Sequence, residues 1–163
     1  MHEIVIFIAE YFIILSAFSA FYVWLKLNRS QKKTFIIEGL ISGVVALVLA
    51  FIGSKLFHNP RPFVVGHFTP YFPHANNNGF PSDHMLLASV FAFVSLKYSK
   101  SFGWALIILA ILIGASRVIS GIHHSIDIVG SVIFASLGVV LARFLVERFI
   151  AKKLDKSKIA KTA

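Results

Sequence analysis

The sequence predicts an all-α fold, a polytopic membrane helix bundle with about five transmembrane helices, its N-terminus outside and its C-terminus inside the cell. Three observations predict it. First, 57% of the 163 residues are hydrophobic and the mean hydropathy is +0.80, which is too apolar for an ordinary soluble domain. Second, several apolar stretches are long enough to cross a bilayer. Third, most basic residues lie in the short segments beside these stretches, which is typical of cytoplasmic loops.

The apolar stretches are the expected transmembrane spans. They cover residues 4–26, 34–57, 83–99, 101–120 and 124–147. A helix needs about 20 residues to cross the hydrocarbon core, and the third stretch is short by that measure. The first stretch has no basic segment before it and no small-residue cleavage site, so we expect a retained helix rather than a signal peptide. We expect a single membrane domain over 1–150 and a basic cytoplasmic tail over 151–163.

The net charge of +9 is unevenly distributed along the chain. The expected spans bring three basic segments to one side of the membrane: the first connection, the third connection and the C-terminal tail. By the positive-inside rule this side is cytoplasmic, and we expect the basic tail to contact anionic lipids rather than nucleic acid. Only Lys55, Arg61 and Arg117 remain for the outer side. Those three basic residues therefore need an explanation other than topology.

Three polar motifs interrupt the apolar sequence, and the expected topology brings all of them to the outer face. They are Lys55 with Arg61-Pro62, Pro81-Ser82-Asp83-His84, and Ser116-Arg117 followed by His123 and Asp127. The first two flank a proline-rich loop at about 58–82, which is long enough to be functional. Guanidinium groups bind phosphoryl oxygens through paired N–H donors, so the motifs predict a phosphate-binding site.

The second and third motifs place reactive side chains at helix ends. Ser82 is expected to cap the third span, which puts Asp83 and His84 in its first turn. His123 is expected to open the fifth span, with Asp127 one turn deeper. This i, i+4 spacing lets the carboxylate accept a ring N–H and hold one tautomer of the imidazole. Two helix N-termini would then face a bound anion, and the oriented histidine can act as a nucleophile or base.

We expect no metal ion and no cofactor at this site. The chain has no Cys, which excludes thiolate nucleophiles and Cys-ligated zinc. His84, His123 and Asp127 are of residue types that ligate zinc. However, two arginines and a lysine around the same point would repel a cation.

The remaining ionisable residues carry weaker signals. Glu10 and Glu38 lie inside expected spans, where charge is costly, and we expect them to be either structural polar contacts or groups that tune the site. Four further histidines are expected to be structural or solvated: His58, His67, His74 and His124.

The motifs resemble the signature of the type 2 phosphatidic acid phosphatase superfamily, which reads K-x6-R-P, P-S-G-H and S-R-x5-H-x3-D. The third motif matches in full, and the resemblance covers about residues 50–135. Asp83 replaces Gly in the second motif, and Lys55 stands one residue closer to Arg61 than in the first. Segments 61–63, 73–75 and 80–84 are most similar to bacterial undecaprenyl pyrophosphate phosphatases of the bacitracin-resistance type. Members commonly have six spans, so we expect this chain to lack the first.

The resemblance implies a metal-independent lipid pyrophosphate phosphatase that forms a phosphohistidine intermediate. In that pattern His123 attacks the terminal phosphorus, Asp127 orients its ring, and His84 protonates the leaving oxygen and then activates water. Four residues would bind the phosphoryl oxygens and two would tune the site. The binding residues are Arg61, Arg117, Ser82 and Lys55, and the tuning residues are Asp83 and Ser116.

The substrate implied by the resemblance is undecaprenyl pyrophosphate, hydrolysed at the outer face of a bacterial cytoplasmic membrane so that the lipid carrier is recycled for peptidoglycan synthesis. Phosphatidic acid or phosphatidylglycerol phosphate would fit the same chemistry. A third alternative is a membrane protein that binds lipid phosphates without turnover, because fold alone does not choose a function. The expected partners are therefore polyprenyl or glycerolipid phosphates and membrane lipids, with the oligomeric state left open.

Overall fold

The computed structural model describes the backbone of residues 2–162 and the side chains of residues 2–149. Six helices follow one another along this part of the chain, and the expected all-α fold is confirmed. They are α1 (His2–Lys26), α2 (Arg29–Leu56), α3 (Pro62–Val65), α4 (Asp83–Tyr98), α5 (Lys100–Ile119) and α6 (Ser125–Thr162). Within the described residues the β-type pairing amounts to an isolated bridge between Pro60 and Asn78.

Four of these helices, α1, α2, α5 and α6, are long and apolar enough to cross a membrane. The expected third span at 83–99 corresponds to α4, which has 16 residues. A helix of that length rises about 24 Å, which is less than the hydrocarbon thickness of about 30 Å. Four of the described helices are therefore candidates for full spans, and the expected count of five, with α4 as the fifth crossing, stays a prediction.

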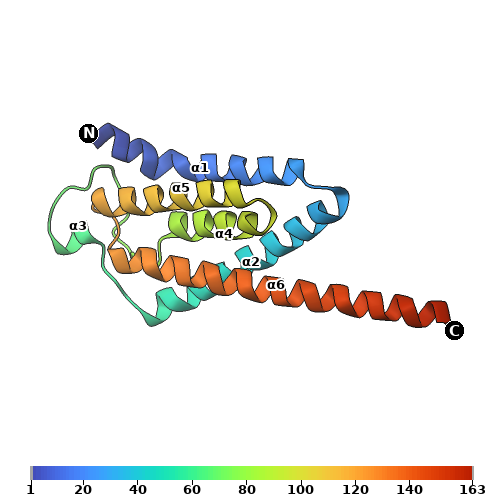
Figure 1. Ribbon diagram of the computed structural model, residues 1–163. Coiled ribbons are helices and arrows are strands. Elements are labelled where there is room, and N and C mark those ends of the chain that lie inside the picture. The colour runs from blue at the N-terminus through green and yellow to red at the C-terminus, as the bar shows by residue number, and fades with distance from the viewer. Residues whose placement is uncertain (1, 163) are drawn as a thin grey trace.

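The short helix α4 runs through the middle of the bundle, with α5 on one side and α6 on the other (Figure 1). It also packs against α1 and α2. Leu86, Ala88 and Ala92 on this helix are completely buried, because apolar and small side chains occupy every face of it. A helix enclosed in this way holds its first residues in a fixed position at the end of the bundle.

The outer helices pack closely on one another and expose apolar side chains outward. A Cβ atom at Gly138 of α6 would lie 2.6 Å from the Ser42 carbonyl oxygen of α2, so the two backbones approach as only glycine allows. Large side chains such as Phe18, Leu40 and Val140 are about two-thirds exposed. Such a surface suits lipid rather than water. The helices form a multi-pass membrane bundle.

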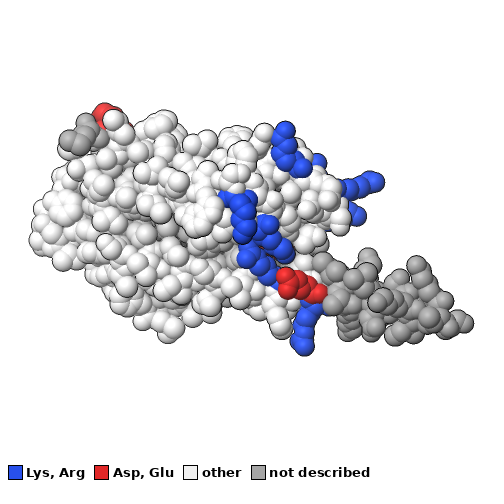
Figure 2. All heavy atoms as spheres, viewed as in Figure 1, with Lys and Arg blue, Asp and Glu red and all other residues white. Residues whose placement is uncertain are grey.

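Basic side chains gather at one end of the bundle. Figure 2 shows Lys and Arg toward the end where α6 leaves the other helices, while the opposite end of this face is almost free of them. At the basic end Lys97 forms an ion pair with the buried carboxylate of Glu38, and the Tyr98 hydroxyl donates to the same carboxylate at 2.9 Å. Glu38 is thus a structural polar contact, one of the two roles expected for it.

Helix α6 is longer than the expected fifth span. It continues to Thr162, so the backbone of the segment expected to be a basic tail is helical as far as that residue. The side chains of residues 150–163 lie outside the described part of the structure. The helix also begins later than expected, at Ser125, which places His123 in the connection that precedes it.

Candidate active site

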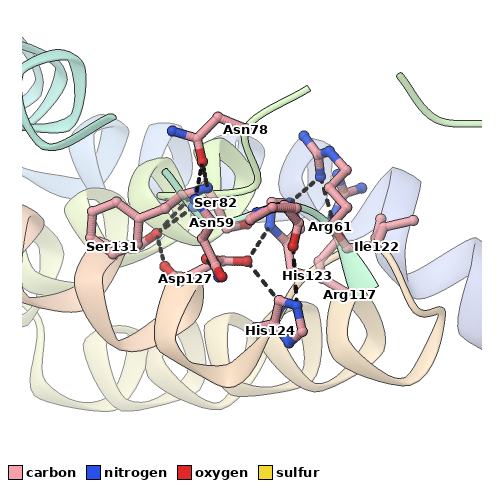
Figure 3. Close-up of polar contacts among 12 residues, drawn as sticks. Asn59, Arg61, Asn78, Ser82, Arg117, Ile122, His123, His124, Asp127 and Ser131 are labelled. Atoms are coloured by element: carbon pink, nitrogen blue, oxygen red, sulfur yellow. Dashed lines mark hydrogen bonds and ion pairs between the residues drawn. The ribbon is translucent and has the colours of Figure 1, made fainter. Parts of the chain in front are cut away.

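The polar motifs meet at the end of the bundle opposite the basic clusters. Figure 3 shows side chains from the α2–α3 connection, the start of α4, the end of α5 and the start of α6 converging on one place. His84, in the first turn of α4, lies within electrostatic range of Arg117 and His123. Segments far apart in the sequence therefore build one site.

His123 and Asp127 form a buried pair. The His123 Nδ1 atom lies 3.3 Å from Asp127 Oδ2, and the two side chains are 3% and 0% exposed. The expected i, i+4 contact is present although His123 precedes the helix. Gly121, with a φ of 77°, reverses the chain after α5, and the backbone N–H of His123 donates to the Arg117 carbonyl at 3.2 Å. The pairing directs the other ring nitrogen, Nε2, away from the carboxylate.

Both carboxylate oxygens of Asp127 accept further hydrogen bonds. The Asn59 side-chain amide donates to Oδ1 at 2.7 Å, and the His124 backbone N–H donates to Oδ2 at 2.8 Å. Asn59 is itself held, because its backbone N–H donates to Asn78 Oδ1 at 2.9 Å and its carbonyl accepts from the Gly79 N–H at 2.9 Å. Asn59 was not expected at the site, since a polar residue between two motif positions has no periodic relation to Asp127.

We predict that Asn59→Ala lowers kcat about tenfold, because the carboxylate loses one of the donors that fix its orientation. KM should stay near the wild-type value, since Asn59 touches Asp127 and not the phosphate. Steady-state phosphate release checks this. A rise in KM with kcat unchanged would contradict the role assigned to Asn59, and Asn76→Ala, an exposed amide in the loop that precedes α4, is the matched control.

Arg61 touches the nucleophile candidate directly. Its Nη1 atom lies 2.9 Å from the Ile122 carbonyl oxygen and 3.3 Å from His123 Nε2, and its Nε donates to Asn77 Oδ1 at 2.9 Å. Burial lowers the pKa of Arg61, while Asp127 and Asp83 act in the opposite direction. An arginine stays protonated in proteins. It therefore donates to Nε2, which requires a neutral His123 ring with its proton on Nδ1.

The electrostatic surroundings of His123 also favour a neutral ring. Burial is the largest cause and lowers the pKa of His123, its hydrogen bond with Asp127 raises it, and Arg61 and Arg117 lower it further. The net direction is below the ordinary histidine pKa of about 6.5. At neutral pH Nε2 consequently carries no proton, and its lone pair can attack once the Arg61 hydrogen bond is released.

Arg117 and Ser82 bring unused hydrogen-bonding capacity to the site. Arg117 Nη1 donates to the Ala9 carbonyl at 3.3 Å, but its Nε is buried without a partner among the described residues, and so is Ser82 Oγ. Ser82 occupies the N-cap position of α4 as expected, yet its hydroxyl makes no capping bond. Its backbone N–H instead donates to Ser131 Oγ at 2.9 Å. Buried donors without partners are costly, and phosphate oxygens would satisfy them.

Lys55 is not brought into contact with the other site residues in the described structure. It is exposed on the last turn of α2, with its Nζ atom 5.5 Å from the centroid of the Phe51 ring. The one-residue shortening of the first motif is consistent with this placement, because positions six and seven residues apart face different directions on a helix.

The two expected tuning residues have different surroundings. Ser116 is buried and its hydroxyl donates to the Ile113 carbonyl at 2.7 Å, within its own helix. Asp83 is exposed and lies within electrostatic range of both Arg61 and Arg117. Of the pair, only Asp83 is placed to influence an anion held by the arginines.

The arrangement suits attack on phosphorus. It combines a neutral, oriented imidazole, two guanidinium groups for phosphoryl oxygens, and a second histidine nearby for proton transfer. Among the described residues no cluster of three or more His, Asp or Glu has the arrangement of a metal site. The positive charge that the site offers to a phosphate is that of the arginines and the helix ends.

Comparisons with known proteins show what the chain is similar to. The family model described as PAP2 superfamily matches residues 37–150. The chain is 33% identical to undecaprenyl-diphosphatase BcrC of Bacillus subtilis, over 91% of this chain and 75% of that protein. It is 30% identical to putative undecaprenyl-diphosphatase YbjG of Escherichia coli, over 89% of this chain and 73% of that protein. The crystal structure of a PAP2-type phosphatidylglycerolphosphate phosphatase from Bacillus subtilis has a similar fold, with a TM-score of 0.61 and 23% identity over 93% of this chain and 77% of that one.

Proposed function

Because this chain belongs to the PAP2 superfamily, we propose that it removes the terminal phosphate of undecaprenyl pyrophosphate through a covalent phosphohistidine. The family resemblance of the three motifs is confirmed, and the chain is a membrane lipid phosphatase. The observation that carries the finer proposal is the buried His123–Asp127 pair with Arg61 donating to the free ring nitrogen.

The first chemical step transfers the terminal phosphate to the protein. The Nε2 lone pair of His123 forms a bond to the terminal phosphorus while the bond from that phosphorus to the bridging oxygen breaks. His84, which the negative charge of the bound substrate helps to protonate, gives its proton to the leaving oxygen. Asp127 stabilises the ring as positive charge develops on it. Arg61 Nη1 moves from Nε2 to a phosphoryl oxygen as the substrate binds, which frees the Nε2 lone pair for the attack.

The second step releases phosphate and restores the enzyme. His84, now neutral, takes a proton from a water molecule as the water oxygen bonds to phosphorus and the P–N bond breaks. Inorganic phosphate and free His123 result. Throughout both steps Arg61, Arg117 and Ser82 hold the equatorial oxygens, which carry most of the charge in a loose transition state.

The choice of a polyprenyl pyrophosphate rests on relatives and on location. The two relatives described above carry the name undecaprenyl-diphosphatase and match most of this chain at 33% and 30% identity. The apolar outer surfaces of the helices allow a long lipid tail to remain in the bilayer while its head group reaches the end of the bundle.

The proposed location is the outer face of a bacterial cytoplasmic membrane, with the N-terminus outside and the C-terminus inside. Supporting this, Lys and Arg gather at one end of the bundle (Figure 2), whereas α4 begins, α5 ends and α6 begins at the other end (Figure 1). Basic segments stay on the cytoplasmic side, so the site faces outward.

We predict that purified protein releases phosphate from undecaprenyl pyrophosphate in preference to phosphatidic acid and phosphatidylglycerol phosphate, and that EDTA leaves this activity unchanged. The reason is that guanidinium groups and helix N-termini supply the positive charge. Initial rates for the three lipids, with and without chelator, check both parts. Preference for a glycerolipid would refute the substrate, and activity lost in EDTA and restored by a divalent ion would refute metal independence.

A further inference from the structure

The loop before α4 carries a histidine, His74, that lies outside the three signature motifs, within the segment 73–75 that contributes to the family resemblance. The ring centroid of His74 lies 6.4 Å from that of His123, with the two planes at 63°. The centroid of the His74 ring also lies 6.2 Å from that of Phe72, with the two rings nearly perpendicular. The Arg117 guanidinium carbon lies 5.7 Å from the Phe72 centroid. His74, expected to be structural or solvated, is therefore a neighbour of the site.

The loop around His74 is fixed on both sides. Three residues earlier, the Tyr71 backbone N–H donates to the Ser120 carbonyl at 3.1 Å. Three residues later, Asn77 Oδ1 accepts from Arg61 Nε at 2.9 Å. The position of the imidazole over His123 is consequently set by hydrogen bonds to the same connections that carry the phosphate-binding residues.

The groups that change the pKa of His74 come from the α2–α3 connection, α4, α5 and the α5–α6 connection. Burial is the largest cause that lowers the pKa of His74 to about 4, followed by Arg61, Arg117, His123 and His84. The ring is neutral in the free protein at pH 7, since its pKa lies below that pH. A bound anion would raise this pKa, because it offsets the positive charges of Arg61 and Arg117.

The proposed chemistry leaves this imidazole without a task on the transferred phosphate. Arg61, Arg117 and Ser82 serve the oxygens of that phosphate, and His84 serves the leaving oxygen. A lipid diphosphate brings a second phosphate with additional negative charge, which two arginines alone do not balance. His123 must stay neutral to attack, and His84 serves the leaving oxygen. His74, whose ring lies beside that of His123, can donate an N–H to the second phosphate.

The distances allow the contact. A phosphorus in position for attack lies about 3 Å from Nε2 of His123. In an in-line attack the second phosphate lies on the side of phosphorus away from Nε2. An oxygen of that second phosphate can lie a hydrogen-bond length of about 2.8 Å from a donor. Rings whose centroids are 6.4 Å apart accommodate this span.

We propose that His74 is a specificity-determining residue, donating an imidazole N–H to the second phosphate of the substrate so that the site selects diphosphates over monophosphates. This inference rests on the proposed function, whose substrate it explains. It assigns to the loop between α3 and α4 a direct part in substrate choice.

The test measures equilibrium binding of inorganic diphosphate and of inorganic phosphate to the full chain by calorimetry. Chemistry is blocked by His123→Ala in every sample, and His74→Ala is compared with His58→Ala, an exposed histidine on the α2–α3 connection. We expect His74→Ala to weaken diphosphate binding about tenfold, the loss of one hydrogen bond to a charged group, with phosphate binding unchanged. His58→Ala should change neither.

Unchanged diphosphate binding in His74→Ala would overturn the inference. So would an equal loss of both ligands, which would mean that the variant disturbs the whole site. In the active background, kcat/KM for undecaprenyl pyrophosphate relative to phosphatidic acid should fall in His74→Ala. Failure of the unmodified protein to hydrolyse undecaprenyl pyrophosphate would instead refute the proposed function, and the binding comparison separates the two results.

Discussion

Replacing His123 with Ala should reduce phosphate release by roughly a thousandfold or more, because the variant has no nucleophile for the phosphorus. Among the described residues, only His123 has one ring nitrogen hydrogen-bonded to Asp127 and the other hydrogen-bonded to an arginine, Arg61. The assay compares initial rates of the purified variant with those of the unmodified protein on undecaprenyl pyrophosphate. His58→Ala serves as the matched histidine variant and should retain activity.

The same variant tests the covalent intermediate. Rapid quenching of the unmodified protein with lipid carrying a labelled terminal phosphate should give labelled protein whose bond is stable to base and labile to acid, as phosphohistidine is. His123→Ala should carry no label. Label retained in His123→Ala would show that another residue is the nucleophile, and turnover retained without label would favour direct attack by water.

The lowered pKa of His123 has a consequence for the pH profile. Attack requires the neutral ring, and the neutral form predominates above the pKa. Since burial holds the pKa of His123 below the ordinary value, kcat/KM should stay constant on acidification down to a pH below about 6.5. An acidic limb centred above that value would show that the ring is protonated more readily than its surroundings predict.

Replacing His84 with Ala should lower the rate by about 10²- to 10⁴-fold on a lipid phosphate monoester, where the leaving alkoxide needs a proton. The loss should be much smaller on an aryl phosphate whose phenol is acidic, because that leaving group departs without protonation. His84 is in the first turn of α4, within electrostatic range of His123 and Arg117, as an acid opposite the nucleophile must be.

The comparison of leaving groups separates proton donation from phosphate binding. Equal losses for the aryl and alkyl substrates in His84→Ala would indicate that His84 holds the phosphate or the fold instead. The amount of labelled phosphoprotein after rapid quenching gives a second criterion. With the aryl substrate, His84→Ala should accumulate phosphoprotein, since hydrolysis of the intermediate still lacks its base.

Much of the molecule follows from local patterns in the sequence. Long apolar stretches predicted the helices, and their ends agree within a few residues for α1, α4 and α5. The spacing from His123 to Asp127 predicted a contact that the structure contains, although His123 lies in the connection before α6 and not on the helix itself. The family resemblance likewise required only residue types in order. The sequence showed that the third stretch is short, but it could not show that the corresponding helix, α4, lies inside the bundle.

The tertiary structure decided which residues meet across connections. Asn59 donates to Asp127, and the centroid of the His74 ring lies 6.4 Å from that of His123. These residues are far apart in the chain, so the period of a single helix or strand could not relate them. The tertiary structure also left Lys55 exposed on α2, and it left the Ser82 hydroxyl without a capping bond although Ser82 occupies the N-cap of α4. A short-range sequence pattern predicts only contacts between residues that are one or two turns apart on the same helix. Contacts between loops depend on the path of the chain around a packed bundle, which is set by all helices together.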